Sequence, residues 1–150
     1  MDIVQRQQEQ KRLLSASIWP IWTQFHARLE QTLQSYEDST RSLGWSARLD
    51  SVHDRCVTIT QQRGIASDRF QNQGLSITVS VRENEPAAIW ATIEEYTERG
   101  GRHVTLQTKK WEYSIIVDVE RGDCHLLRDT VSMTPWEAAD HLIAETILKT

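Results

Sequence analysis

The segment LSITVSVR, residues 75–82, decides the fold of this chain because apolar and polar side chains alternate in it without exception. Its odd-numbered residues are all aliphatic, and its even-numbered residues are serine, threonine, serine and arginine. Successive side chains of a β-strand point to opposite faces of the sheet, so this alternation indicates a strand with one dry and one wet face. The segment therefore predicts a sheet that is covered on one side only.

Similar alternation on both sides of this segment predicts further strands. They lie at 46–49, 55–62, 87–97, 103–109, 111–120 and 124–128. Their connections are short, which predicts antiparallel neighbours because parallel strands need long crossovers. The exception is the polar stretch 63–74, which we expect to be a loop longer than a hairpin needs and thus a candidate for function. The pattern predicts an antiparallel meander sheet of five or six strands.

Residues 1–40 carry the apolar spacing of an amphipathic helix. The apolar side chains at steps of three or four are Leu14, Ile18, Ile21, Phe25, Leu29, Leu33 and Tyr36. Pro20 interrupts the pattern, because proline lacks an N–H and clashes with the preceding turn, so either a kink or a break is expected there. We expect a strong helix from about Trp19 to Tyr36, with residues 1–18 forming a mobile arm or a first short helix.

A second helix is predicted at the C-terminal end, where the start signal is clear. Thr134 suits the N-cap, Pro135 the first helical position and Glu137 the third, which together make a capping box. Its expected buried face consists of Ala139, Leu142, Ile143, Thr146 and Ile147. The two helices are the available covers for the apolar sheet face. We therefore predict a single α+β domain over residues 1–150, with a kinked N-terminal helix and a C-terminal helix packed on one face.

Charge and hydropathy exclude several classes of protein. The net charge of −4 disfavours a nucleic-acid partner. The only feature that favours nucleic-acid binding is a small basic patch at Arg99, Arg102, Lys109 and Lys110. The sequence has no run of about 18 apolar residues and no apolar core of a secretory signal, so we expect a cytoplasmic protein without a membrane partner. Its two cysteines are expected to be free thiols, unless the strands bring them together.

No catalytic or metal-binding motif is present. The sequence lacks the C-x-x-C, H-x-x-x-H and H-E-x-x-H spacings of zinc sites and the G-x-S-x-G of hydrolases. His53 and Cys56 would form a metal site with Cys124 and His125 only if strands 55–62 and 123–128 were neighbours. We therefore expect no catalytic residue, no metal and no cofactor, and we lean towards a protein that is not an enzyme.

Aromatic and acidic side chains near the middle of the sheet offer one alternative function. A small-molecule pocket between the sheet and the helices would be lined by Trp90, Glu94, Tyr96, Trp111 and Tyr113. The competing interpretation is a solvated sheet face with cross-strand pairs of opposite charge.

The aromatic residues Trp19, Trp22 and Phe25 make the apolar surface of the N-terminal helix wider than one stripe. The excess would bind another protein or a second copy of the chain, unless a kinked helix buries it against the sheet. We therefore predict a non-enzymatic protein–protein interaction module of adaptor, chaperone or immunity type, which forms a homodimer through this helix. The order of elements, a helix, a meander sheet and a second helix, is similar to that of bacterial secretion chaperones and toxin-immunity proteins. This resemblance concerns the order of the elements, and no sequence motif supports it.

Overall fold

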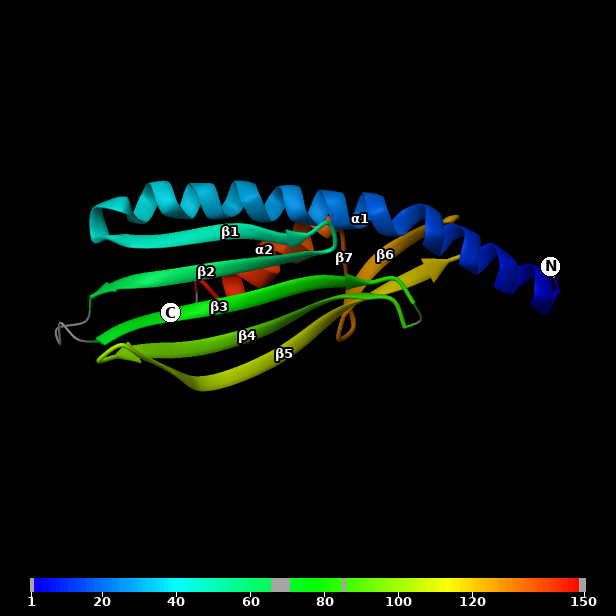
Figure 1. Cartoon of the computed structure of the whole chain (residues 1–150). Coiled ribbons are helices and arrows are strands. Elements are labelled where there is room, and N and C mark those ends of the chain that lie inside the picture. Colours follow the sequence, from blue (N-terminus) through cyan, green and yellow to red (C-terminus); the bar gives the residue numbers. More distant parts are fainter. Residues whose placement is uncertain (1, 66–70, 85, 149–150) are drawn as a thin grey trace.

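The computed structural model describes residues 2–65, 71–84 and 86–148 of the chain. A long helix α1 (Ile3–Thr40) and a short 3-10 helix η1 (Arg41–Leu43) precede the sheet, and helix α2 (Pro135–Glu145) follows it. The strands are β1 (Trp45–His53), β2 (Cys56–Ile65), β3 (Gln71–Arg82), β4 (Ala88–Arg99), β5 (Arg102–Asp118), β6 (Asp123–Arg128) and β7 (Val131–Met133). Figure 1 shows α1 running along the sheet beside β1, with α2 behind the strands.

The described strands form one antiparallel sheet in which the spatial order is the sequence order, β1 to β7. The predicted antiparallel meander is confirmed, with seven strands in place of five or six. The short strand β7 was not expected, and the segments 103–109 and 111–120 belong to one continuous strand, β5. Alternation predicts strands well where one face is buried, whereas β7 and the first half of β5 are largely exposed.

The predicted loop at 63–74 is wrong at both of its ends. Strand β2 continues to Ile65, and β3 begins at Gln71, where Asn72 lies opposite Ile65. The remainder of that prediction, residues 66–70, lies outside the described residues. Strands β2 and β3 stay paired beyond the residues whose alternation predicted them, because backbone hydrogen bonds do not require an alternating side-chain pattern.

The N-terminal helix is a continuous helix of 38 residues that contains Pro20, so a break at this residue is excluded. Proline at position 20 cannot donate to the carbonyl of Ala16, and its ring clashes with the preceding turn, which bends a helix axis. Figure 1 shows that α1 bends in its N-terminal part and projects beyond the strands. None of the helices in the described chain is both long and apolar enough to span a membrane.

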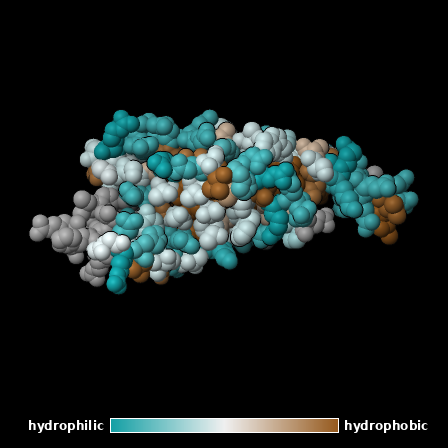
Figure 2. Space-filling model, in the orientation of Figure 1, coloured by the Kyte–Doolittle hydropathy of each residue, from teal (hydrophilic) through white to brown (hydrophobic). Residues whose placement is uncertain are grey.

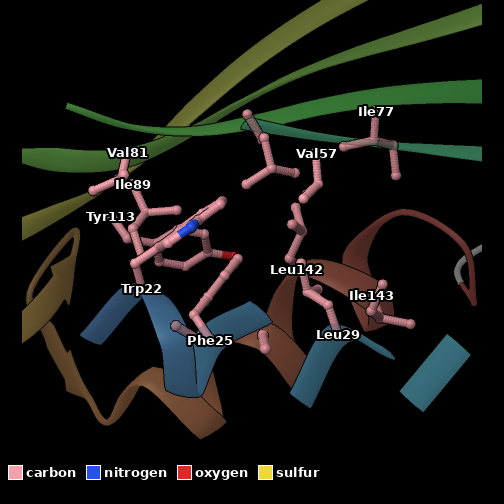
Figure 3. Packing of buried hydrophobic residues seen from close by; sticks show 14 of the residues in the cluster. Trp22, Phe25, Leu29, Val57, Ile77, Val81, Ile89, Tyr113, Leu142 and Ile143 are labelled. Atoms are coloured by element: carbon pink, nitrogen blue, oxygen red, sulfur yellow. The ribbon is translucent and has the colours of Figure 1, made fainter. Parts of the chain in front are cut away.

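The hydrophobic core lies between the two helices and one face of the sheet (Figure 3). Phe25 and Leu29 of α1 and Leu142 of α2 are completely buried. The strands contribute the aliphatic side chains of their alternating pattern, including Ile77, Val79, Ile89 and Ile115. The prediction that both terminal helices cover one face is therefore confirmed.

Helix α2 begins as its sequence predicts. The Oγ1 of Thr134 accepts a hydrogen bond from the backbone N–H of Glu137 at 3.1 Å, and the Oε1 of Glu137 accepts one from the N–H of Thr134 at 3.2 Å. Two backbone donors at the helix start are thereby satisfied. The predicted buried face is also confirmed, because Ala139, Leu142, Ile143, Thr146 and Ile147 are all buried.

A polar clamp joins the two helices outside the core. Arg28 of α1 donates through Nε and Nη2 to both carboxylate oxygens of Asp140 on α2, at 2.7 and 3.1 Å. Thr32 adds a hydrogen bond of 3.1 Å from its Oγ1 to the same carboxylate. The guanidinium and the hydroxyl together hold the pKa of Asp140 below its ordinary value, with Arg28 as the main cause.

Strand β5 changes partners along its length. Residues Arg102–Ser114 pair with β4, whereas Ser114–Asp118 pair with β6. The two ladders overlap only at Ser114, so each end of β5 has one side without a strand partner among the described residues. These two open sides are the principal irregularities of an otherwise simple meander.

Candidate interaction surface

The five residues predicted to form a ligand site come from β4 and β5, but the register of these strands places them on opposite faces of the sheet. Trp90 lies opposite Glu112, and Ala91 lies opposite Trp111. Directly opposed residues share a face, so Trp111 points to the side of the buried Ala91 and Trp90 to the other side. The set separates into Trp90, Glu94 and Tyr96 on the outer face and Trp111 and Tyr113 on the helix-covered face.

In the outer-face group, Tyr96 packs against the neighbouring strands. Tyr96 lies over Gly74, and a Cβ atom added to this glycine would stand 2.6 Å from the tyrosine Oη. The imidazole of His103 stacks on the Tyr96 ring, with the ring centroids 4.6 Å apart. Burial is the main cause that raises the pKa of Tyr96, and the nearby carboxylate of Glu98 raises it further. Trp90 and Glu94 are half-buried. Tyr96, only 5% exposed, is thus covered rather than presented to a ligand.

The inner-face group is an aromatic cluster at the border of the core. Tyr113 is fully buried, and its hydroxyl shares a hydrogen bond of 2.8 Å with Nδ1 of His141 on α2. Trp111 lies near the same imidazole, with ring centroids 6.0 Å apart, and Arg128 stacks 4.4 Å above the Trp111 ring. Burial raises the pKa of Tyr113 far above its ordinary value, so this phenol stays protonated near neutral pH. The cluster stabilises the contact between β5 and α2.

A cavity between α2 and the sheet adjoins this cluster, but its volume is about 70 Å³. Its walls are Leu75, Ile93, Glu95, Gln107, Lys109, Trp111, Glu145 and Thr146. Pockets for metabolite-sized ligands occupy about 300 to 1,000 Å³. Of the five predicted ligand residues only Trp111 lines this cavity, and its volume does not match a small-molecule site of the predicted kind.

The residues with potential for metal or covalent chemistry are dispersed. No group of three or more His, Cys, Asp or Glu side chains gathers in a metal-binding arrangement within the described parts of the chain. Strands β2 and β6, which would have to be neighbours for the considered metal site, are separated by three strands. Both cysteines are free and half-buried. Burial raises the pKa of the Cys56 thiol, which opposes its activation as a nucleophile.

The three aromatic residues predicted to contact a partner divide between core and surface. Phe25 is fully buried and Trp22 is 2% exposed, with the indole N–H of Trp22 donating to the backbone carbonyl of Asp54 at 2.8 Å. Trp19 is 52% exposed. The bent helix thus buries two of the three side chains within the monomer, and Trp19 alone remains available to a partner.

The most exposed part of α1 is its first three turns, Ile3–Arg12, which we call the arm. Among its residues, the aliphatic side chains Ile3 and Val4 are 77% and 62% exposed. A capping box fixes its start. The Oδ1 of Asp2 accepts a hydrogen bond from the backbone N–H of Gln5 at 2.7 Å, and the Oε1 of Gln5 accepts one from the backbone N–H of Asp2 at 3.1 Å. Figure 2 shows the arm as a largely hydrophilic projection that carries hydrophobic surface at its end.

An apolar groove lies where the arm leaves the body, along the β5 side that β4 leaves open. The groove has a volume of about 500 Å³ and is lined by Gln10, Leu14, Pro86, Ala87, Ser114, Ile115, Ile116 and Val117. Sequence reasoning raised an arm within residues 1–18 as one possibility, but it did not identify the groove. One signal for the arm was present, because Ile3 precedes Leu14 by about three helical turns and so shares its face. The groove depends on the stagger between β4 and β6, which side-chain alternation does not encode.

Comparison of the chain with family models, with curated proteins and with solved structures finds no significant match.

Proposed function

We propose that this chain is a non-enzymatic protein–protein interaction module that forms a homodimer through the arm of α1. The observation that supports the proposal is the exposed aliphatic tip of the arm, Ile3 and Val4, on a molecule that also has an apolar groove at Leu14, Ala87 and Ile115–Val117. Helices in proteins are stabilised mainly by tertiary packing, so an arm without such packing gains stability from a partner.

The arm and the groove suit a reciprocal contact. An arm of ten residues is about 15 Å long, enough to reach across to a neighbouring copy. If the tip of one copy occupies the groove of the other, a two-fold axis repeats the contact, and one surface serves both copies. Each buried aliphatic side chain contributes roughly 1.5 to 3 kcal/mol relative to an exposed one.

The interior of the molecule favours surface contacts over internal binding. The helix-covered sheet face is filled by core side chains, and the cavity beside α2 is about 70 Å³. The apolar surface that remains lies on the arm, in the groove and at single positions such as Trp19. An adaptor, chaperone or immunity type of protein uses such outer surfaces.

Light scattering coupled to size-exclusion chromatography tests the proposal over a range of protein concentrations. The wild-type chain is expected to show the mass of two chains, and Ile3→Asp is expected to show the mass of one because the charge cannot enter an apolar groove. Ala16→Asp is the matched control, since it adds the same charge at an exposed position on the side of α1 opposite Ile3 and Val4, and it should stay dimeric. A wild-type chain that remains monomeric, or an Ile3→Asp variant that dimerises normally, would contradict the proposal.

A further inference from the structure

Strand β5 has two open sides. The side of residues 102–113 that faces away from β4 is longer than the side of residues 115–118 that β4 leaves open beside the groove. Strand β6 takes over as a partner only at Ser114, so Arg102–Tyr113 has no strand on this side within the described chain. The far end of this edge is closed by Arg128, whose Nη1 donates to the carbonyl of Glu112 at 3.4 Å and whose guanidinium covers Trp111. Residues 102–111 therefore form what we call the open edge.

The side chains of the open edge carry one sign of charge. Arg102, Lys109 and Lys110 are exposed cations, and the segment contains no carboxylate, although the whole chain has a net charge of −4. None of the ion pairs found among the described residues involves these three side chains. Val104 and Leu106, which are 45% and 60% exposed, add apolar surface between them. The open edge is thus a basic strand that has no strand partner on this side in the part of the chain that the structure describes.

We propose that the open edge binds an extended acidic segment of another protein, which adds to the sheet as a further strand beside β5. Backbone hydrogen bonds would give affinity in this mode of binding, and alternate side chains would give specificity. Lys109 and Lys110 point to opposite faces of β5, so the added strand would carry carboxylates on both of its faces beside them and beside Arg102. Its apolar side chains would contact Val104 and Leu106. Glu94 and Glu98 of β4 pair on the other side of β5, whereas Glu95 and Glu145 line the cavity that Lys109 also lines.

A second copy of this chain does not suit the same edge. Pairing two open edges would bring three cations of one strand to three cations of the other, and like charges across a ladder are unfavourable. The open edge is thus separate from the arm and groove, and its occupant differs from theirs.

Two features of the edge also protect exposed strands against aggregation. The register between β4 and β5 shifts at Glu95 and Tyr96, which leaves Leu106 as an extra residue in a bulge, and lysines follow at 109 and 110. If the bulge and the lysines served only to prevent aggregation, the open edge would bind neither an acidic nor a basic peptide strand. An experiment with peptides of defined charge separates the two roles.

The probe is a fluorescein-labelled peptide that repeats two glutamates and two valines, so that both faces of the strand carry carboxylates, and it is titrated against the full chain by fluorescence anisotropy. Binding is expected, with backbone amide shifts in residues 102–111 by NMR. The double substitution of Lys109→Glu and Lys110→Glu should weaken binding by about tenfold or more. The double substitution of Arg41→Glu and Arg121→Glu is the matched control, because it changes the net charge by the same amount at exposed positions outside the edge, and it should leave the affinity within about twofold. The Ile3→Asp variant should bind the peptide as the wild-type chain does, so failure of the dimer proposal would not affect this result.

Three control ligands define the results that overturn the proposal. A peptide with proline in place of each valine keeps the charge but loses backbone donors, so it should not bind; equal binding would show charge attraction without strand addition. A peptide with lysine in place of glutamate should not bind either. Tighter binding of single-stranded RNA than of the acidic peptide, or no binding of the acidic peptide at all, would each contradict the proposal.

Discussion

The two parts of α1 belong to one continuous helix but are stabilised in different ways. From Leu13 to Tyr36, every turn buries at least one apolar side chain against the sheet or α2. From Ile3 to Arg12 the helix relies on a capping box and on one ion pair between Glu9 and Arg12. Helices in proteins are stabilised mainly by tertiary packing, so the body of α1 is secured within the monomer and the arm is not. The arm is therefore where a partner can contribute most.

The largest expected effect comes from removing a core side chain in the body of α1. Phe25 is completely buried between the sheet and α2, so Phe25→Ala should lower the free energy of unfolding by roughly 3 to 5 kcal/mol. Urea unfolding followed by circular dichroism measures the loss. Trp19→Ala, on the exposed side of the same helix, should cost about 1 kcal/mol or less. If both variants lost the same free energy of unfolding, the assignment of Phe25 to the buried side and Trp19 to the exposed side of α1 would be wrong.

A smaller effect is expected from the clamp that fixes the body of α1 to α2. Asp140→Asn removes the charge that Arg28 and Thr32 contact, and since Asp140 is partly exposed the loss should be about 1 kcal/mol at pH 7. The comparison of urea midpoints for the two proteins at pH 7 measures this difference.

The clamp also predicts a pH dependence with a definite sign. The folded pKa of Asp140 is lowered, so its contribution to stability is fully present above the unfolded pKa of about 3.9 and is lost as the pH falls through the folded value. The difference between wild-type and Asp140→Asn stability should therefore shrink on acidification from pH 5 to pH 2. A difference that grows in acid would contradict the assignment.

The smallest effect on global stability is expected from the arm. Asp2→Ala removes the side chain that accepts from the Gln5 amide, and an N-cap of this kind stabilises a helix end by about 1 kcal/mol. The loss should appear as faster hydrogen exchange in the arm of the monomeric Ile3→Asp background, while the global free energy of unfolding changes by less than about 0.5 kcal/mol. A large global change would mean that the arm packs against its own domain.

The body of the molecule was predictable because burial leaves a pattern in the sequence. Alternation at 75–82 predicts β3, the spacing from Leu14 to Tyr36 predicts the covering helix, and Thr134 with Glu137 predicts the start of α2. The largely exposed strand β7 and the ends of β2 and β3 at 63–65 and 71–74 show no such alternation in the sequence. The helix across Pro20 was ambiguous in sequence, since a proline either bends a helix or ends it.

The candidate site was less predictable than the fold. Whether the side chains of Trp90 and Trp111 share a face depends on the register between β4 and β5, because a shift of one residue moves a side chain to the other face. The role of Trp22 and Phe25 depended on how α1 lies on the sheet, which their spacing alone does not determine. The groove and the open edge arise because β4 and β6 pair with different parts of β5, a property of chain lengths and turns rather than of side-chain type.

The most direct test of the dimer proposal is an isotope-filtered NOE experiment on a mixture of methyl-labelled and unlabelled chains. The proposal predicts intermolecular NOEs between the methyl groups of Ile3 in one copy and those of Ile115 and Ile116 in the other. Contacts of Ile3 that arise only within one copy, or an Ile3 without any long-range NOE in a sample of two-chain mass, would contradict it.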